Sequence, residues 1–141
     1  MTISARNQLS AKVKTIKAGA VNDQIELSLN DKETLVAVIT SESTQNLNLS
    51  EGRDVMAVFK APSVILSTDE SLVFSARNQL RGVVESVNHG AVNCEVLVKT
   101  QGGAKIVAII TETSAKNMNL AQGSNVQVLV KASHVLLAVK K

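Results

Sequence analysis

The hexapeptide SARNQL occupies residues 4–9 and returns unchanged at residues 75–80, an offset of 71 positions. Two further segments repeat at the same offset: GAVN at 19–22 and 90–93, and VAVIT at 36–40 with VAIIT at 107–111. When residues 4–66 are paired with residues 75–137 without a gap, 25 of the 63 positions are identical. A constant offset over so long a stretch indicates a tandem duplication of one structural unit.

The repeat predicts the domain organisation of the 141-residue chain. We expect one domain at residues 1–66 and a second at residues 75–141, joined by a linker, STDESLVF, at residues 67–74. Each repeat has about 65 residues, a size at which an isolated hydrophobic core is only marginally stable. We therefore expect the two domains to support each other.

Apolar residues within each repeat follow the period of a β-strand. The run LSAKV at residues 9–13 alternates apolar with polar side chains. Four further β-rich runs follow, at residues 25–29, 35–39, 55–59 and 64–66. Residues 41–49 differ, because they suit a short helix that is entered from Thr40 or Ser41 and ends before Gly52.

Five short strands with one helix between the third and the fourth predict a particular all-β architecture. This order is typical of an OB-type barrel, so we expect two tandem OB-type five-stranded barrels, each with one short helix. Periodicity alone also allows a pair of unrelated β-meanders.

Composition and charge argue against a nucleic-acid partner. Phe59 and Phe74 are the only aromatic residues, so the chain lacks the rings on which single-stranded bases stack. The net charge of +3 is too small to suggest a protein that coats nucleic acid. Because OB-type barrels can bind nucleic acids, an OB-type nucleic-acid-binding protein is kept as the alternative function.

The sequence also predicts where the protein is located. Its apolar runs are far shorter than the roughly 18 to 20 residues needed to cross a bilayer, so we expect no membrane association. The first ten residues have neither the charged nor the apolar region of a secretory signal. A single cysteine, Cys94, cannot form an intrachain disulfide. We therefore expect a cytoplasmic protein.

The duplication allows a test of candidate site residues, because a polar residue present in both repeats is a better candidate than one present once. His89, His134 and Cys94 each align with a residue of another type, so we expect no site for a bare metal cation. The acidic residues of the first repeat likewise align with non-acidic residues, which argues against paired-carboxylate chemistry. With no nucleophile motif either, we expect that the protein is not an enzyme.

The polar pairs that do recur at the 71-residue offset include Ser4 and Ser75, Arg6 and Arg77, Asn22 and Asn93, Thr40 and Thr111, Ser43 and Ser114, and Lys60 and Lys131. Most of them are hydrogen-bond donors or cations, which is the chemistry that binds a small oxyanion. Hydroxyls at a helix start also lie beside free backbone N–H groups, where an anion is favoured. In the alternative interpretation Thr40 and Ser43 only cap the helix, Lys60 is a solvated strand-edge charge and Asn22 is a turn residue.

These motifs resemble those of a known family. The repeat has SARN near its start, GAVN about fifteen residues later, TxxS at the helix and KA near its end, and together these resemble the molbindins. The resemblance covers nearly the whole chain, and two units in one polypeptide are similar to the di-domain cytoplasmic molybdate-binding proteins. It implies barrels around a threefold axis, hence a homotrimer, that bind molybdate or tungstate for storage or homeostasis without a cofactor.

The resemblance also implies two kinds of oxyanion site. Interdomain sites would use Ser4, Arg6, Thr40, Ser43, Lys60 and Ala61, and in the second repeat Ser75, Arg77, Thr111, Ser114, Lys131 and Ala132. Axial sites would use mostly the backbone of Ala20, Val21 and Asn22, or of Ala91, Val92 and Asn93. The residues that follow the KA pair differ between the repeats, so the two copies are expected to bind with unequal affinity.

Overall fold

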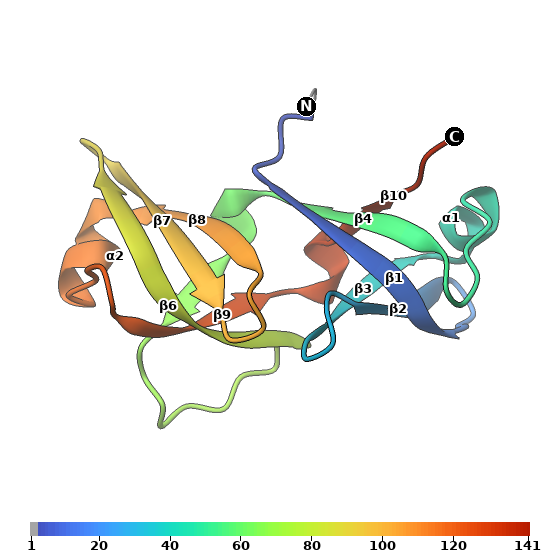
Figure 1. Ribbon diagram of the computed structural model, residues 1–141, viewed down its shortest axis with the longest axis horizontal. Coiled ribbons are helices and arrows are strands. Elements are labelled where there is room, and N and C mark those ends of the chain that lie inside the picture. Colours follow the sequence, from blue (N-terminus) through green and yellow to red (C-terminus); the bar gives the residue numbers. More distant parts are fainter. Residues whose placement is uncertain (1–2) are drawn as a thin grey trace. The chain divides into compact units, whose positions relative to one another are not determined.

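The computed structural model describes residues 3–141, which form two compact units (Figure 1). The first unit consists of the described residues through Phe59 together with Lys131–Lys141, and the second consists of Lys60–Val130. Within the described residues each unit is one five-stranded antiparallel sheet with a short α-helix and a 3-10 turn. The all-β prediction with five strands and one helix per unit is therefore confirmed.

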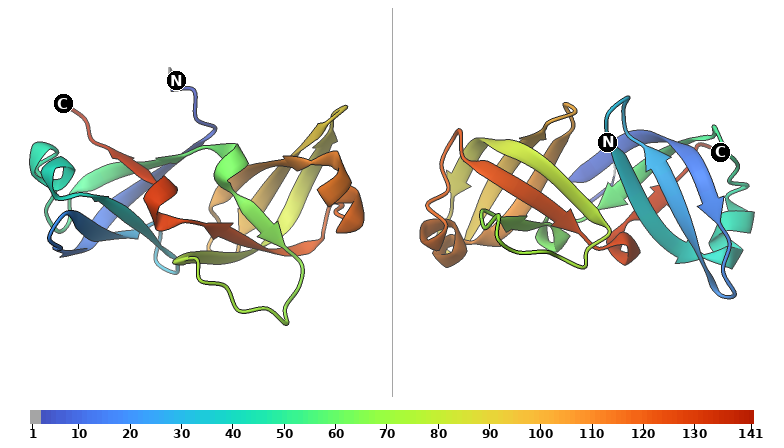
Figure 2. Two further views of the ribbon diagram at one scale, coloured as in Figure 1. Left: turned by 180° about the vertical axis from the view of Figure 1, so that it is seen from behind. Right: turned by 90° about the horizontal axis from the view of Figure 1, so that it is seen from below.

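The first unit combines most of the first repeat with the end of the chain. Its elements are β1 (Asn7–Lys17), β2 (Asn22–Ser28), β3 (Thr34–Thr40), α1 (Ser41–Asn46), β4 (Asp54–Phe59), the 3-10 turn η2 (Ala132–His134) and β10 (Leu136–Ala138). The sheet order is β10-β4-β1-β2-β3. Strands β10 and β3, at the two edges, also approach each other, so the sheet curls towards a barrel (Figure 2).

The second unit has the same arrangement. Its elements are the 3-10 turn η1 (Ala61–Ser63), β5 (Ile65–Ser67), β6 (Asn78–His89), β7 (Asn93–Thr100), β8 (Lys105–Thr111), α2 (Glu112–Asn117) and β9 (Asn125–Val130). The sheet order is β5-β9-β6-β7-β8, and the edge strands β5 and β8 again approach each other.

The last strand of each repeat completes the sheet of the other unit. β10 ends the second repeat but pairs with β4, with Leu136 opposite Val58. β5 ends the first repeat but pairs with β9, with Ile65 opposite Leu129. The backbone is extended where the chain changes unit, with φ −79° and ψ 142° at Lys60, and η1 and β5, which follow, belong to the second unit.

This strand exchange separates the sequence repeats from the compact units. The segment at 67–74, expected as a linker between domains, connects β5 to β6 and lies inside the second unit. The chain passes from one unit to the other at Phe59–Lys60 and at Val130–Lys131 instead. Sequence identity marks the stretch that was duplicated, whereas pairing with a distant strand decides to which sheet the last strand is added.

Alternating apolar side chains form the core of each unit, as the period-two pattern predicts. In β2, Ile25 and Leu27 have no exposed surface, and in β7 the same holds for Val96 and Val98. Phe59, at the end of β4, is 1% exposed and is the largest fully buried side chain among the described residues. The core is otherwise aliphatic, because the chain has so few aromatic residues.

The α-helices are shorter than expected from the sequence. α1 ends at Asn46 and not at residue 49, because Asn48 adopts a left-handed conformation with φ 50°. The N–H of Leu49 then donates to the carbonyl of Thr44 at 3.1 Å, which closes the helix end. Asn119 repeats this conformation with φ 51°. No helix among the described residues is long and apolar enough to span a membrane.

Candidate functional site

The GAVN segments form the turns that lead from β1 into β2 and from β6 into β7. In the second unit the N–H of Gly90 donates to the carbonyl of Asn93 at 3.0 Å, which closes the turn. In the first unit a Cβ added at Gly19 would overlap the carbonyl oxygen of Asn22. This close approach of backbone to backbone requires glycine, so the recurrence of GAVN has a structural cause.

The tip of each turn offers backbone donors to solvent. No hydrogen bond within residues 3–141 uses the N–H groups of Ala20 and Val21, or those of Ala91 and Val92. The carbonyl of Val21 is engaged, because it accepts from the N–H of Ser41 at 2.8 Å. The side chains of Val21 and Val92 are 71% and 73% exposed. These N–H groups are the donors that the predicted axial sites would use.

The TxxS helix start lies at the same end of the sheet as the GAVN turn. Asn22 is the cross-strand partner of Thr40 between β2 and β3. Asn93 is likewise the partner of Thr111 between β7 and β8. The structure therefore brings together residues that the sequence assigns to two different kinds of site.

Thr40 and Thr111 cap their helices, as the alternative interpretation of the TxxS motif proposed. The Oγ1 atom of Thr40 accepts from the N–H of Ser43 at 3.1 Å and donates to Ser43 Oγ at 2.8 Å. Thr111 makes the same two hydrogen bonds to Ser114. In this arrangement the serine hydroxyl accepts from threonine and keeps its own proton for donation to a ligand. Capping and ligand binding are therefore compatible.

The two recurring lysines precede the 3-10 turns. Lys60 and Lys131 are exposed, and neither forms an ion pair with another described residue. Each is followed by a buried alanine, Ala61 or Ala132, which anchors the turn. The lysine side chains are thus held at a fixed point of the backbone with their charges accessible.

The strand exchange distributes the predicted interdomain residues in an unexpected way. Lys131 and Ala132 belong to the compact unit that contains Thr40, and Lys60 and Ala61 belong to the unit that contains Thr111. The recurring lysine and the recurring hydroxyls of one repeat are therefore in different units.

The start of β1 lies far from the helix start of the same unit. Ser4 and Arg6 are exposed and directly precede β1, which runs for eleven residues from Asn7. At about 3.3 Å per residue, the strand spans roughly 30 Å before the turn that leads to Asn22 and Thr40. Ser75 and Arg77 precede β6 in the same way. One unit alone therefore cannot place Arg6 and Thr40 on one small anion.

A buried carboxylate that sequence reasoning missed supports the turn of the first unit. Asp23 is 5% exposed and accepts from Ser41 Oγ at 2.7 Å and from the N–H of Gly19 at 3.1 Å. Hydrogen bonds from Ser41, Thr44 and Gly19, in decreasing order of effect, hold the pKa of Asp23 below its ordinary value of 3.8. The carboxylate thus ties the turn to the start of α1.

The second unit supports its turn with a carboxylate from another position. Cys94 stands where the first unit has Asp23, and Glu112 of α2 accepts from the N–H of Gly90 at 3.1 Å. The hydrogen bond from His89 is the main cause that lowers the pKa of Glu112. Comparison of identical residues missed this acid because it moved from strand to helix. The sequence signal that could have revealed it is a pair of linked differences between the repeats: Asp23 aligns with Cys94, and Ser41 aligns with Glu112.

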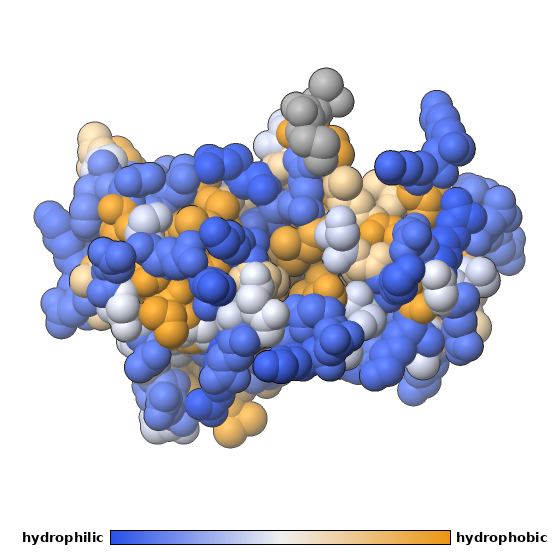
Figure 3. Space-filling model, viewed as in Figure 1, coloured by the Kyte–Doolittle hydropathy of each residue, from blue (hydrophilic) through white to orange (hydrophobic). Residues whose placement is uncertain are grey.

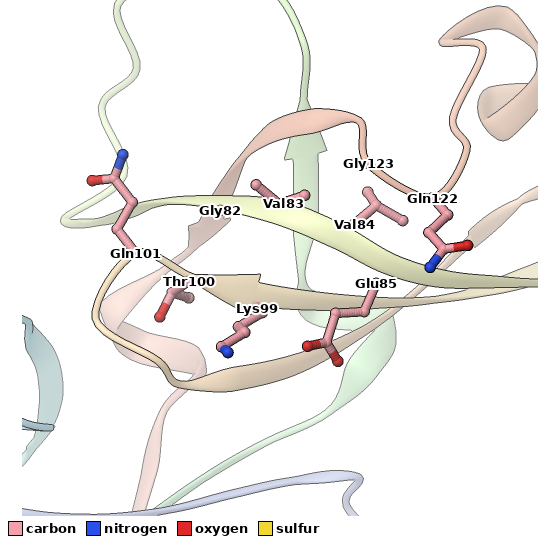
Figure 4. A pocket seen from close by; sticks show the side chains of 9 residues that line it. All are labelled: Gly82, Val83, Val84, Glu85, Lys99, Thr100, Gln101, Gln122 and Gly123. Carbon is pink, nitrogen blue, oxygen red and sulfur yellow. The ribbon is translucent and has the colours of Figure 1, made fainter.

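A groove of about 610 Å³ lies beside the start of β6 and the end of β7 in the second unit, and none of the predicted site residues line it (Figure 4). It is lined by Gly82, Val83, Val84, Glu85, Lys99, Thr100, Gln101, Gln122 and Gly123. A Cβ added at Gly82 would lie 2.7 Å from the carbonyl oxygen of Lys99, so glycine is what lets β6 pass so close to β7. The first repeat has Ala11 at this position, and the groove therefore has no recurring counterpart in sequence.

Comparison with known proteins establishes the family. The model of the TOBE domain matches residues 3–66 and 75–137, which is most of the chain. The chain therefore belongs to the TOBE domain family, with two copies of the domain. A solved structure of the cytoplasmic molybdate-binding protein ModG, with molybdate bound, superposes with a TM-score of 0.95 at 42% identity. That match covers 99% of this chain and 100% of the other, and it confirms the resemblance to di-domain molbindins and the two-barrel fold.

Curated relatives agree with this assignment. The chain is 40% identical over 141 residues to the molybdenum-pterin-binding protein MopA of Rhodobacter capsulatus. It is 38% identical over 139 residues to the molybdenum transport protein ModE of Azotobacter vinelandii, and each match covers 99% of this chain. The matches cover 53% and 52% of those two proteins, so the chain spans about half the length of the curated relatives it matches.

Proposed function

We propose that this protein binds molybdate and related tetrahedral oxyanions by hydrogen bonds and charge, and releases them chemically unchanged. One observation carries the proposal: the likeness to ModG with molybdate bound extends over nearly the whole chain, at 42% identity and a TM-score of 0.95. The recurring donors and cations supply suitable chemistry for a dianion with four oxygen atoms.

The proposed axial sites rest on the exposed turn tips. Each tip offers two adjacent backbone N–H groups that make no hydrogen bond within residues 3–141, and such groups can donate to an anion. The residues are Ala20, Val21 and Asn22 in the first unit, and Ala91, Val92 and Asn93 in the second.

The proposed interdomain sites combine charged and hydroxyl donors from different surfaces. Their residues are Ser4, Arg6, Lys60, Ala61, Ser75, Arg77, Lys131 and Ala132, with the helix starts Thr40, Ser43, Thr111 and Ser114. Within a unit Arg6 is separated from Thr40 by the length of β1. A site that uses both groups therefore needs a second surface, which we propose comes from another copy of the chain in a homotrimer.

Sedimentation measurements test the assembly. A species with the mass of three chains is expected at the concentrations at which molybdate binds. A stable monomer with full molybdate binding would remove the need for a second copy and overturn the homotrimer.

We propose a cytoplasmic role in storage and homeostasis of molybdate. ModG is described as a cytoplasmic molybdate-binding protein, and non-covalent binding allows release as well as uptake. Tungstate has the same charge and nearly the same shape, so calorimetric titration should give similar affinities for molybdate and tungstate. Sulfate is smaller, and its titration measures how strictly the sites select by size.

Substitution of the recurring lysines tests whether they bind the ligand. In the double variant Lys60→Ala/Lys131→Ala, each interdomain site loses a charge-assisted hydrogen bond of about 1.5 to 3 kcal/mol. Molybdate affinity at those sites should fall roughly tenfold to a hundredfold, while the axial sites change little. Lys32→Ala/Lys99→Ala removes the same net charge at two other exposed positions and serves as the matched control. Equal affinities in the two double variants would remove Lys60 and Lys131 from the sites.

A nucleic-acid titration tests the alternative function. One relative, from Escherichia coli (strain K12), is described as the DNA-binding transcriptional dual regulator ModE, and it is 34% identical over 136 residues. The match covers 51% of that protein, and the present chain has only two phenylalanines on which bases could stack. Single-stranded and duplex oligonucleotides should bind weakly and lose affinity steeply with salt. Tight binding that molybdate does not affect would favour the alternative.

A further inference from the structure

Three side chains of different metal-ligating types meet in the second unit. His89 ends β6, Cys94 is its cross-strand partner in β7, and Glu112 begins α2. One ligand atom from each of the three residues lies within 4.8 Å of the other two. The set offers an imidazole nitrogen, a sulfur and a carboxylate oxygen, the combination that a borderline-soft divalent cation prefers.

We propose that His89, Cys94 and Glu112 bind one zinc-class divalent cation, with water in the fourth position. Zinc takes these ligands at about 2.0 to 2.3 Å in a tetrahedron, which places the ligand atoms about 3.5 Å apart. His89 Nδ1 lies 2.5 Å from Glu112 Oε1, so this pair must widen by about 1 Å. The His89 side chain is 58% exposed and can rotate to make that adjustment.

The burial of the three ligands is graded in a way that suits a cation site. Cys94 has no exposed surface, the Glu112 side chain is 14% exposed, and His89 is the most exposed of the three. A thiolate at the buried end would be shielded from water, while an ion could enter past the imidazole. Glu112 is already oriented, because its other oxygen, Oε2, accepts from the N–H of Gly90 at 3.1 Å.

Charge balance favours a divalent ion over a monovalent one. A thiol loses its proton when it binds a metal ion, so binding would release one proton to the buffer and form a bond between the Cys94 thiolate and the ion. The two charges of the ion are then matched by one thiolate and one carboxylate, which leaves the partly buried cluster neutral.

The site occurs once per chain, which is why the sequence predicts no metal. The aligned residues of the first repeat are Ala18, Asp23 and Ser41, which offer a single carboxylate. A criterion that accepts only residues present in both repeats rejects His89 and Cys94. The residues next to the GAVN turn therefore offer three metal-ligand types in the second unit but only one carboxylate in the first.

Titration of the full chain with Co²⁺ tests the proposal. Under anaerobic, reducing conditions we expect one equivalent of Co²⁺ to give thiolate charge-transfer absorption and the visible bands of a tetrahedral ion. Zn²⁺ should displace it, whereas Mg²⁺, which prefers oxygen ligands, should not. Absence of the charge-transfer band at saturating Co²⁺ would overturn the proposal.

Variants identify the ligands. Cys94→Ala should abolish the charge-transfer absorption, and His89→Ala should weaken Co²⁺ binding by more than tenfold. His89 is exposed, so its replacement should leave the circular dichroism spectrum unchanged and keep the test independent of folding. His134→Ala, an exposed histidine of the other unit, is the control and should bind like the parent. Parental affinity in His89→Ala would overturn the proposal, whatever the outcome of the molybdate titrations.

Discussion

Val135 allows the strand exchange to be tested by one substitution, because its sequence repeat and its structural unit differ. The residue lies in the second repeat, between η2 and β10, but belongs to the compact unit that contains β1 to β4. It is 1% exposed. Val64 is the matched position, since it lies in the first repeat, is 2% exposed and belongs to the second unit.

The expected loss of stability follows from the size of the deleted group. Val135→Ala removes two buried methyl groups, each worth about 0.8 kcal/mol of transfer free energy. The cavity left behind adds to this, so the first unit should be destabilised by about 2 kcal/mol. Because 1.4 kcal/mol corresponds to a factor of ten, opening of that unit should become about 30-fold more frequent.

Native-state hydrogen exchange read by mass spectrometry locates the effect. In Val135→Ala the slowest amides of β1, β2 and β4 should exchange about 30-fold faster, with a smaller change in β6, β7 and β9. Val64→Ala should give the reverse pattern. If Val135→Ala accelerated exchange only in β6 to β9, the last strand would belong to its own repeat and the exchanged arrangement would be refuted.

Three further predictions concern the cap, the turn and the response to acid. Thr111→Ala should lower the free energy of unfolding by about 1 kcal/mol in urea denaturation, and Thr111→Ser should retain most of it. Gly19→Ala should lower the thermal unfolding temperature, because the new methyl group overlaps the carbonyl oxygen of Asn22; an increase would contradict the turn geometry. The lowered pKa of Asp23 means that its carboxylate stabilises the fold above the ordinary pKa of 3.8, and that this contribution is lost as the pH falls through the lower folded value. The stability difference between the parent and Asp23→Asn should therefore shrink on acidification, and a difference that is constant with pH would contradict it.

Features that depend on near neighbours in sequence could be predicted well. The alternation around residues 9–13 sets which face of β1 is buried, and the TxxS spacing marks the start of each α-helix. Both follow from local geometry, since side chains alternate along a strand and a threonine at the N-cap reaches the third residue beyond it. The end of α1 could not be predicted in this way, because the helical period over residues 41–49 does not show which residue ends the last turn. In the structure the left-handed conformation of Asn48 ends it.

Features that depend on distant partners could not be predicted. The alternation of apolar and polar residues around Leu136 is the same whether β10 pairs with a strand of its own repeat or with β4. Periodicity therefore does not predict to which sheet β10 is added. The same holds for the cluster at His89, whose members come from β6, β7 and α2. The recurrence of residues identified candidate donors at Asn22 and Thr40, but their pairing at one sheet end appears only in the fold. Oxyanion binding by these residues stays a prediction.

The surface of the molecule is mostly polar on the face in view, with scattered apolar side chains (Figure 3). Two of the exposed apolar residues, Ile65 and Leu136, lie on the exchanged strands β5 and β10 at the edges of the sheets. Edge strands with accessible apolar residues are prone to further pairing. Their shortness, three residues each, limits the length of any such additional pairing.

The position of segment 67–74 within one unit changes what a cut there would do. Val73 is 99% exposed, so a protease could reach this stretch. Cleavage would leave two fragments, each of which carries the final strand of the other's sheet, and they would stay bound as a non-covalent heterodimer. Viewed as an event in evolution, joining two copies of the gene makes permanent a partnership that separate single-repeat chains could form only by exchanging their tails. The fused protein folds without a search for a partner, and its stability against separation of the two halves no longer depends on how much of it the cell makes.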